Sequence, residues 1–237
     1  MATVITNLVS AIPYIGNDIV ITLWGGFSVA NPTLNRFYSL HYLLPFLLSA
    51  LVILHLNALH EHGSSNPLGI NSNQDKIHFH PYFTSKDLYY FILFIGLFSF
   101  LVFFIPNYLN HPDNYIEANP LVTPLSIQPE WYLLVPYAIL KIIPNKLIGV
   151  IALILSIIIL FFLPFYSSFN IRSNYLRSFA KFNFWLFVGS YFVLLICGAL
   201  PISEEIVIIS TIGSIYYFAY FLIIIPLNFI IDAIIVL

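Results

Sequence analysis

The sequence predicts an all-α membrane protein, a transmembrane helical bundle of five spans plus amphipathic surface helices on the outer side. Of the 237 residues, 60% are hydrophobic and only 8% are charged, whereas a soluble domain has about 25% charged residues. Five apolar runs also reach the length of about 20 residues that crosses the hydrocarbon core of a bilayer. A chain of this composition cannot cover a water-facing surface, which excludes a soluble protein.

The expected spans are residues 36–57, 87–106, 147–166, 182–200 and about 206–231. Three of them contain a proline, at Pro45, Pro164 and Pro226. Proline is tolerated in membrane helices because neighbouring groups can satisfy the carbonyl that it leaves unpaired.

These spans divide the chain into four segments. Residues 1–35 are an amphipathic connector on the outer face, 36–106 hold the first two spans and an inner loop, 107–146 are an outer-face loop, and 147–237 hold the last three spans. The outer loop is too apolar to float in water, so we expect it to lie on the membrane face as short helices. Prolines interrupt it at Pro120, Pro124, Pro129 and Pro136.

Loop charges predict the orientation. Cytoplasmic or matrix-side loops carry an excess of Lys and Arg. The 58–86 and 167–181 loops carry more of these charges than the opposite side, so we place both loops and the C-terminus inside. The inner charges are Lys76, Lys86, Arg172, Arg177 and Lys181, and the outer ones are Arg36, Lys141 and Lys146.

Two histidines, His41 and His55, stand at the ends of the apolar stretch HYLLPFLLSALVILH. Fourteen residues turn an α-helix through about 1400°, which is about 40° short of four full turns. The two imidazoles therefore face the same side, about 21 Å apart along the axis. Ionisable groups inside a span are costly and point toward a partner in the bundle.

Two interpretations of these histidines remain open. Each imidazole could hydrogen-bond to a neighbouring helix, or each could supply one axial ligand of an iron porphyrin whose other ligand comes from a partner helix. Neither histidine has a second ligand three or four residues further on, which excludes a compact histidine-cluster metal site. An iron held by two imidazoles transfers electrons and leaves no open position for oxygen.

Several stretches resemble the cytochrome b family, in the fungal mitochondrial form that is the haem-bearing core of the cytochrome bc1 complex. They include SAIPYIGNDIV, LWGGFSVANPTLNRFYSLHYLLPF, HPDNYIEANPLVTP and the diagnostic PEWY motif. The resemblance implies that His41 ligates a low-potential haem b near the outer face and that His55 ligates a high-potential haem b near the matrix.

The same resemblance implies the activity. The chain would be the electron-transfer subunit, and catalytic core, of ubiquinol–cytochrome c reductase in the mitochondrial inner membrane. Quinol would be oxidised at the outer side, and electrons would pass through the two haems to a quinone at the matrix side, with coupled proton translocation. The implied partners are the Rieske iron–sulfur protein and cytochrome c1 in a dimeric complex, together with membrane lipids; no nucleic acid is expected.

The resemblance covers the last five of the family's eight spans and the connector before them. The family helix that carries the other two axial histidines has no counterpart in this sequence. We therefore expect this chain to be incomplete by itself and to need the N-terminal half of cytochrome b as a partner for both haem sites.

Glu130 lies in QPEWYLL, between a proline and two aromatic residues. One interpretation is an interfacial aromatic belt with the glutamate facing water. The resemblance favours a quinol-oxidation pocket, in which a shielded carboxylate accepts a proton released by the quinol. It implies a proton-accepting role for Glu130 and a wall role for Tyr137, and it adds the cofactor-binding residues Pro129, Tyr132, Ile5 and Arg36.

Polar residues also gather at the inner ends of the first two spans. They can be read as solvated helix ends, with Asp87 favourably placed in a first helical turn. The resemblance implies a quinone-reduction site, where His60 and Asp87 contact the quinone and deliver protons. Ser64 and Lys86 would assist them.

Two rival functions remain open from the residues alone. The chain could be a haem-free membrane transporter or channel subunit in which the histidines form a proton relay. It could also be a structural subunit that binds no cofactor.

Overall fold

The structure, a computed structural model, describes residues 2–122, 127–166, 173–175 and 177–236. Helix accounts for 74% of the chain, and no strand occurs among the described residues, so the predicted all-α fold is confirmed. Pro124 and Arg172, which entered the predictions above, lie outside the described residues. The chain forms two compact units, residues 1–69 with 120–237 and residues 70–119.

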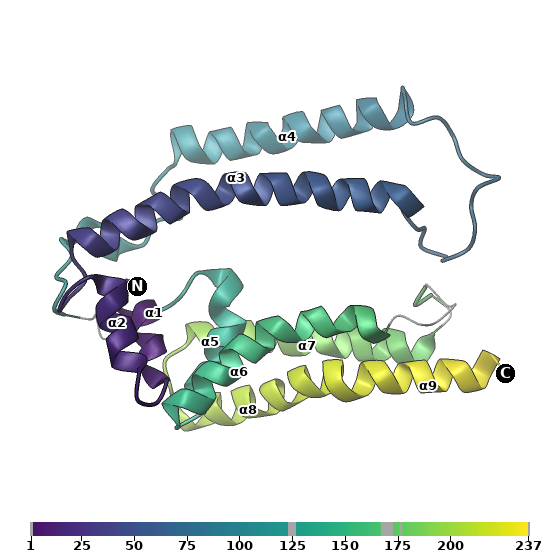
Figure 1. Cartoon of the computed structure of the whole chain (residues 1–237). Helices are drawn as coiled ribbons and strands as arrows, with labels where there is room; N and C mark the ends of the chain where they lie inside the picture. Colours follow the sequence, from purple (N-terminus) through teal and green to yellow (C-terminus); the bar gives the residue numbers. More distant parts are fainter. Residues whose placement is uncertain (1, 123–126, 167–172, 176, 237) are drawn as a thin grey trace. The chain divides into compact units, whose positions relative to one another are not determined.

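The first unit begins with two short helices that precede one very long helix. Its elements in chain order are α1 (Ala2–Asn7), the 3₁₀ turn η1 (Leu8–Ala11), α2 (Gly16–Trp24), α3 (Asn31–His62), η3 (Trp131–Leu133), α5 (Leu134–Ile142), α6 (Lys146–Ile158), η4 (Ile159–Tyr166), α7 (Ser178–Ala199), α8 (Glu204–Ala219), the π-helical turn η5 (Tyr220–Ile224) and α9 (Ile225–Val236). The helices α8 and α9 run on from one another as one rod (Figure 1).

Five helical segments are long and apolar enough to cross a membrane, as predicted. They are Asn31–His62, Tyr82–Phe104, Lys146–Tyr166, Ser178–Ala199 and Glu204–Asp232. The first is longer than the expected 36–57 at both ends. Hydropathy marks only the residues that would lie in lipid, whereas the helical hydrogen bonds continue into the polar residues on either side.

The three prolines within the spans have different consequences. Pro45 lies inside α3, which stays helical on both sides of it. Pro164 lies where α6 has tightened into the 3₁₀ turn η4. Pro226 follows the π-helical turn η5, which widens the last span just before a residue that has no N–H to donate.

The core of the first unit forms where α5, α6, α7 and the last span pack together. It contains Val135, Ala138, Ile139, Ile159, Leu194, Tyr217, Tyr220 and Phe221. The Tyr217 hydroxyl donates a hydrogen bond of 2.8 Å to the Ser156 carbonyl oxygen. The ring of Phe187 stacks on Tyr220 at 4.2 Å between centroids. Aromatic packing thus joins α7 to the π-helical part of the last span.

The helix α5 lies in the segment that the sequence assigns to the membrane face. It has nine residues, too few to cross a bilayer. One face is buried against α6 and α7, through Leu134, Val135, Ala138 and Ile139. Gly198, near the end of α7, makes this contact possible, since a Cβ atom there would overlap the Leu134 carbonyl group.

The second unit contains α4 (Tyr82–Phe104) and the 3₁₀ turn η2 (Pro112–Tyr115). The His80 Nδ1 atom and the Thr84 hydroxyl form a hydrogen bond of 2.8 Å near the start of α4, and the ring tautomer decides which of them donates. The His111 ring accepts from the Asp113 backbone N–H at 3.2 Å and so caps η2. These two histidines are engaged in local contacts at the ends of helices.

A matched pair of glycine substitutions tests the contact between α5 and α7. Gly198→Ala should lower stability by about 1–3 kcal/mol, because the added methyl group forces the two backbones apart. Gly189→Ala in the same helix meets no atom within 4 Å and should be neutral or stabilising by up to about 1 kcal/mol. Thermal unfolding of the purified protein in detergent measures both. Equal unfolding temperatures for the two variants would contradict this packing.

Candidate functional site

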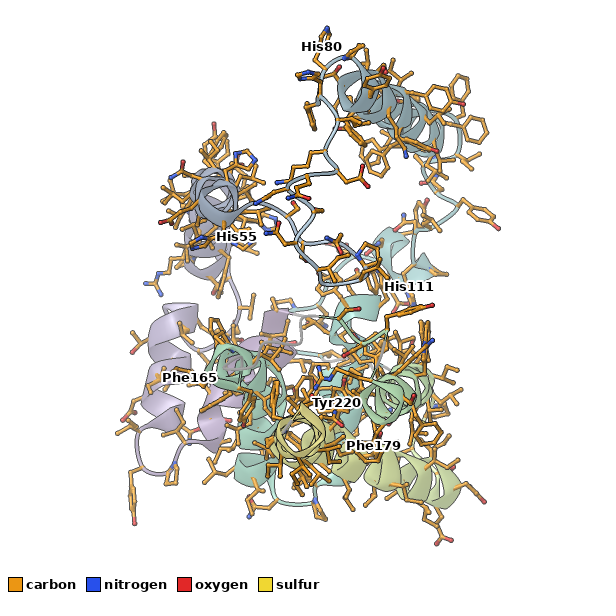
Figure 2. All side chains as sticks on the ribbon, turned by 90° about the vertical axis from the view of Figure 1, so that its right-hand side faces the viewer. His55, His80, His111, Phe165, Phe179 and Tyr220 are labelled. Atoms are coloured by element: carbon orange, nitrogen blue, oxygen red, sulfur yellow. The ribbon has the colours of Figure 1, made fainter. Side chains whose placement is uncertain are left out.

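The helix α3 carries both candidate haem ligands. It is helical without a break from Asn31 to His62, so His41 and His55 keep the spacing that the sequence predicts. Both side chains are exposed, and neither forms a hydrogen bond or ion pair with another residue in the part of the chain that the structure describes. Figure 2 looks along this helix and shows its side chains, that of His55 among them, radiating outward.

The apolar middle of α3 is more exposed than that of the other membrane spans in this unit. No residue is buried in the most apolar 18-residue window of α3. In the other three spans of the same unit, 17%, 22% and 33% of the corresponding window is buried. An unpaired imidazole facing hydrocarbon is costly. The histidines of α3 therefore require partners beyond the contacts that this structure contains.

The start of α3 is fixed by hydrogen bonds to the end of α2. The Thr33 hydroxyl, almost completely buried, donates to the Trp24 carbonyl oxygen at 2.6 Å. The Arg36 guanidinium donates to the carbonyl oxygens of Thr22 and Leu23. Between them, Gly25 ends α2 at φ +71°, a conformation that favours glycine.

Arg36, expected to bind a cofactor, therefore has a structural role here as a cap on the carbonyl end of α2. Its side chain remains exposed. Cofactor binding by Arg36 stays a prediction.

The PEWY motif lies at the entrance to α5. Glu130 precedes the turn η3, and its side chain is exposed. Trp131 and Tyr132 are also exposed, at 69% and 55%, and their rings meet edge to face. Pro129 is half-buried. This arrangement, an open carboxylate beside two exposed aromatic rings, is compatible with an interfacial belt and with one wall of an apolar slot.

Two hydrogen bonds fix the backbone around this motif. The Tyr137 hydroxyl donates to the Ile127 carbonyl oxygen at 3.0 Å. This half-buried tyrosine therefore holds the backbone segment that leads to Glu130. The Gln128 side-chain amide donates to the Ala199 carbonyl oxygen at 2.5 Å. The motif is therefore attached to the end of α7 as well as to α5.

Lys141 is a site residue that sequence reasoning missed. Its ammonium group donates to three carbonyl oxygens at the end of α7, those of Cys197 and Gly198 at 3.3 Å and that of Leu200 at 2.6 Å. It also lies 5.1 Å from the centre of the Tyr137 ring. Burial lowers the pKa of Lys141, and the Coulombic interaction with Cys197 opposes that shift. A cation here complements the negative end of the helix dipole.

The N-terminal segment lies at this same end of the first unit. Lys146, at the start of α6, donates to the Ser10 hydroxyl at 2.6 Å, and η1 contacts α6. Ile5 on α1 is 53% exposed. The structure thus gathers the connector, the PEWY motif and the end of α7 at one end of the first unit.

The four inner-side residues divide between the two units. His60 lies in the last turn of α3 and Ser64 just after it, whereas Lys86 and Asp87 lie in the first part of α4. All four side chains are exposed. Their predicted meeting at a quinone stays a prediction.

The described residues contain no group of three or more His, Cys, Asp or Glu side chains that could hold a metal ion. Each candidate histidine can therefore contribute one ligand only. That donor set fits an iron porphyrin, in which four ligands come from the macrocycle and the protein supplies the axial ones.

Five apolar spans and an all-helical fold define a multi-pass membrane protein. Two family models cover nearly all of it: cytochrome b (N-terminal)/b6/petB matches residues 1–112, and cytochrome b (C-terminal)/b6/petD matches residues 117–218. The chain belongs to the cytochrome b family, as the sequence motifs predict.

Cytochromes b from several organisms are similar over almost the whole chain. The protein of Spizellomyces punctatus is 58% identical over 227 residues, that of Saccharomyces cerevisiae 55% over 225, and that of Dictyostelium citrinum 52% over 235. These alignments cover 96%, 95% and 99% of this chain but 57%, 58% and 61% of the relatives. The chain therefore spans about three fifths of the length of the relatives it matches.

A solved structure supports the fold. A chain of a structure described as "Hyperthermophilic respiratory Complex III" matches with a TM-score of 0.86 and 33% sequence identity. The match covers 96% of this chain and 62% of that chain. This match confirms the predicted fold class.

Lys141→Met tests the cap on α7. The variant removes three hydrogen bonds to backbone carbonyls, which water replaces only in part, and should lower stability by about 1–3 kcal/mol. Lys181→Met is the matched control, because the Lys181 ammonium forms no hydrogen bond with the described residues. Thermal unfolding of both variants in one detergent decides the matter, and an unchanged midpoint for Lys141→Met would show that the cap contributes nothing.

Proposed function

We propose that this chain is the electron-transfer core of a ubiquinol–cytochrome c oxidoreductase. It would oxidise quinol on the outer side and deliver electrons across the membrane to a quinone on the matrix side, with coupled proton translocation. The observation that carries the proposal is the unbroken helix α3, on which His41 and His55 stand fourteen residues apart with no other described partner. Membership of the cytochrome b family favours this function over a haem-free transporter or a subunit that binds no cofactor.

His41 and His55 would each hold one haem b through a single imidazole nitrogen. When bound, the two haems supply one-electron transfer between the faces of the membrane. The second axial ligands would come from the N-terminal half of cytochrome b, which fits the exposed face of α3. The costly unpaired state of two imidazoles in an apolar span would then be relieved.

Glu130 would accept a proton on the outer side. Oxidation of one quinol releases two electrons and two protons, and a carboxylate beside the slot can take one proton from a quinol hydroxyl. Tyr137 would hold the backbone at Ile127 and so the position of the motif. Pro129, Tyr132 and Ile5 would shape the apolar walls, and Arg36 would keep the outer end of α3 in place.

The inner side would take up protons. Reduction of a quinone consumes two electrons and two protons, and His60 and Asp87 would donate the protons at the two carbonyl oxygens. Ser64 and Lys86 would orient the ring through hydrogen bonds. The excess of Lys and Arg on this side supports the orientation with the matrix at the end of α3 that bears His60.

The partners proposed for the assembled enzyme are the Rieske iron–sulfur protein and cytochrome c1, in a dimeric complex of the mitochondrial inner membrane. The cytochrome b relatives and the match to a respiratory Complex III structure support this setting.

Histidine substitutions in the assembled complex test the cofactor assignment. His41→Ala and His55→Ala should each abolish one of two haem absorption bands and leave the other, because each removes one axial ligand. His78→Ala, which changes an exposed loop histidine outside α3, should keep both bands. Reduced-minus-oxidised spectra with a redox titration measure this, and retention of both haems in His41→Ala and His55→Ala would contradict the proposal.

Glu130→Gln tests proton acceptance. The amide keeps the shape of the side chain but cannot take the proton, so quinol oxidation should slow by about 100-fold or more while both haems remain. Glu204→Gln, at the exposed start of α8, provides the matched control and should retain the parent rate. A parent rate in Glu130→Gln would assign this glutamate to the interfacial belt.

A further inference from the structure

A small cavity lies in the first unit, between the start of α7 and the segment formed by η5 and the first turns of α9. Its volume is about 160 Å³, and it is lined by Asn174, Arg177, Ala180, Tyr220, Ile225, Asn228 and Phe229. Figure 2 shows Tyr220 among the side chains of the C-terminal helices. Nothing in the proposed electron-transfer function uses this cavity.

The ion pair beside the cavity lies at the ends of two membrane spans. Arg177 immediately precedes the span Ser178–Ala199, and Asp232 ends the span Glu204–Asp232. Both residues therefore belong to the boundary between hydrocarbon and polar surroundings.

Arg177 and Asp232 form an ion pair with little solvent contact. Their side chains are 13% and 10% exposed, and the guanidinium also donates to the Asn174 side-chain oxygen at 3.2 Å. The charges of the pair cancel. A ligand that carried net charge would leave that charge uncompensated in a poorly hydrated place, which is unfavourable.

Two further polar atoms at the cavity are buried without a hydrogen-bond partner among the described residues. They are the Arg177 Nε, a donor, and the Asn228 Oδ1, an acceptor. Asn228 is only 7% exposed. Buried polar groups are normally paired, so the cavity calls for a ligand that accepts one hydrogen bond and donates another.

We propose that this cavity binds the headgroup of phosphatidylethanolamine. A phosphate oxygen accepts from the Arg177 Nε–H, and the primary ammonium group donates to the Asn228 Oδ1 on the side of Asp232. The headgroup is zwitterionic, which matches the neutral ion pair. Its acyl chains extend into the hydrocarbon beside the spans.

The same chemistry discriminates against other headgroups. The quaternary ammonium of phosphatidylcholine has no N–H and cannot donate to Asn228. Phosphatidylglycerol adds a negative charge beside the Asp232 carboxylate. The cavity should therefore prefer a headgroup that has an N–H donor and no net charge.

Native mass spectrometry of the full chain in its purified complex tests the proposal. The complex is taken from nanodiscs that contain equal amounts of phosphatidylethanolamine and phosphatidylcholine. The most tightly retained lipid should be phosphatidylethanolamine, present at about ten times the amount of phosphatidylcholine, because one hydrogen bond to a charged group has about this effect. Equal retention of the two lipids would overturn the proposal, and so would preferred retention of phosphatidylglycerol when it is included as a third equal component. Displacement by millimolar soluble phosphoethanolamine would overturn the assignment to a lipid.

Asn228→Leu should remove the preference, because the acceptor is lost while the volume is kept. Asn183→Leu is the matched control: Asn183 is equally buried at 7%, but its amide already donates to the Phe179 carbonyl oxygen at 2.9 Å, and it does not line the cavity. This variant should retain the parent preference. An unchanged preference in Asn228→Leu would contradict the assigned contact.

Discussion

The free-energy cost of placing an imidazole in an apolar helix is the constraint on which the rest of this structure depends. The hydrocarbon of a bilayer cannot hydrogen-bond to a histidine, so each histidine in a span needs a ligand or partner. The helix α3 presents two such side chains, and its regular geometry from Asn31 to His62 keeps them on one side at two depths. No described residue pairs with either imidazole, and no residue is buried in the most apolar window of α3, so a partner for both would have to come from outside this structure.

The outer end of the first unit depends on contacts of a different kind. Here the backbone of α5 lies against the end of α7, where Gly198 leaves room for the Leu134 carbonyl group. Lys141 and Gln128 then satisfy carbonyl oxygens that the end of α7 leaves without helical partners. These contacts fix the segment that contains Glu130, although Glu130 itself is exposed. A rigid backbone around an exposed carboxylate is consistent with the role proposed for Glu130, in which its carboxylate meets a mobile quinol.

Much of the fold follows from the sequence because the bilayer imposes one length and one composition on every span. The five spans and the register of His41 and His55 could be predicted for that reason. The sequence does not reveal the role of Lys141, because its acceptors lie 56 to 59 positions further along the chain. The ion pair of Arg177 and Asp232 and the π-helical turn at Tyr220–Ile224 are likewise products of tertiary packing. The inner-side residues fall in two separate units, so their meeting at a quinone stays a prediction from the family resemblance.

A density map of the assembled protein at the two imidazoles tests the central claim most directly. We expect a flat macrocycle against His41 and another against His55, at the two depths that their fourteen-residue spacing on α3 sets, about 21 Å apart along the helix axis. A map in which both rings face lipid or pack on protein, with no macrocycle within reach of either, would contradict it.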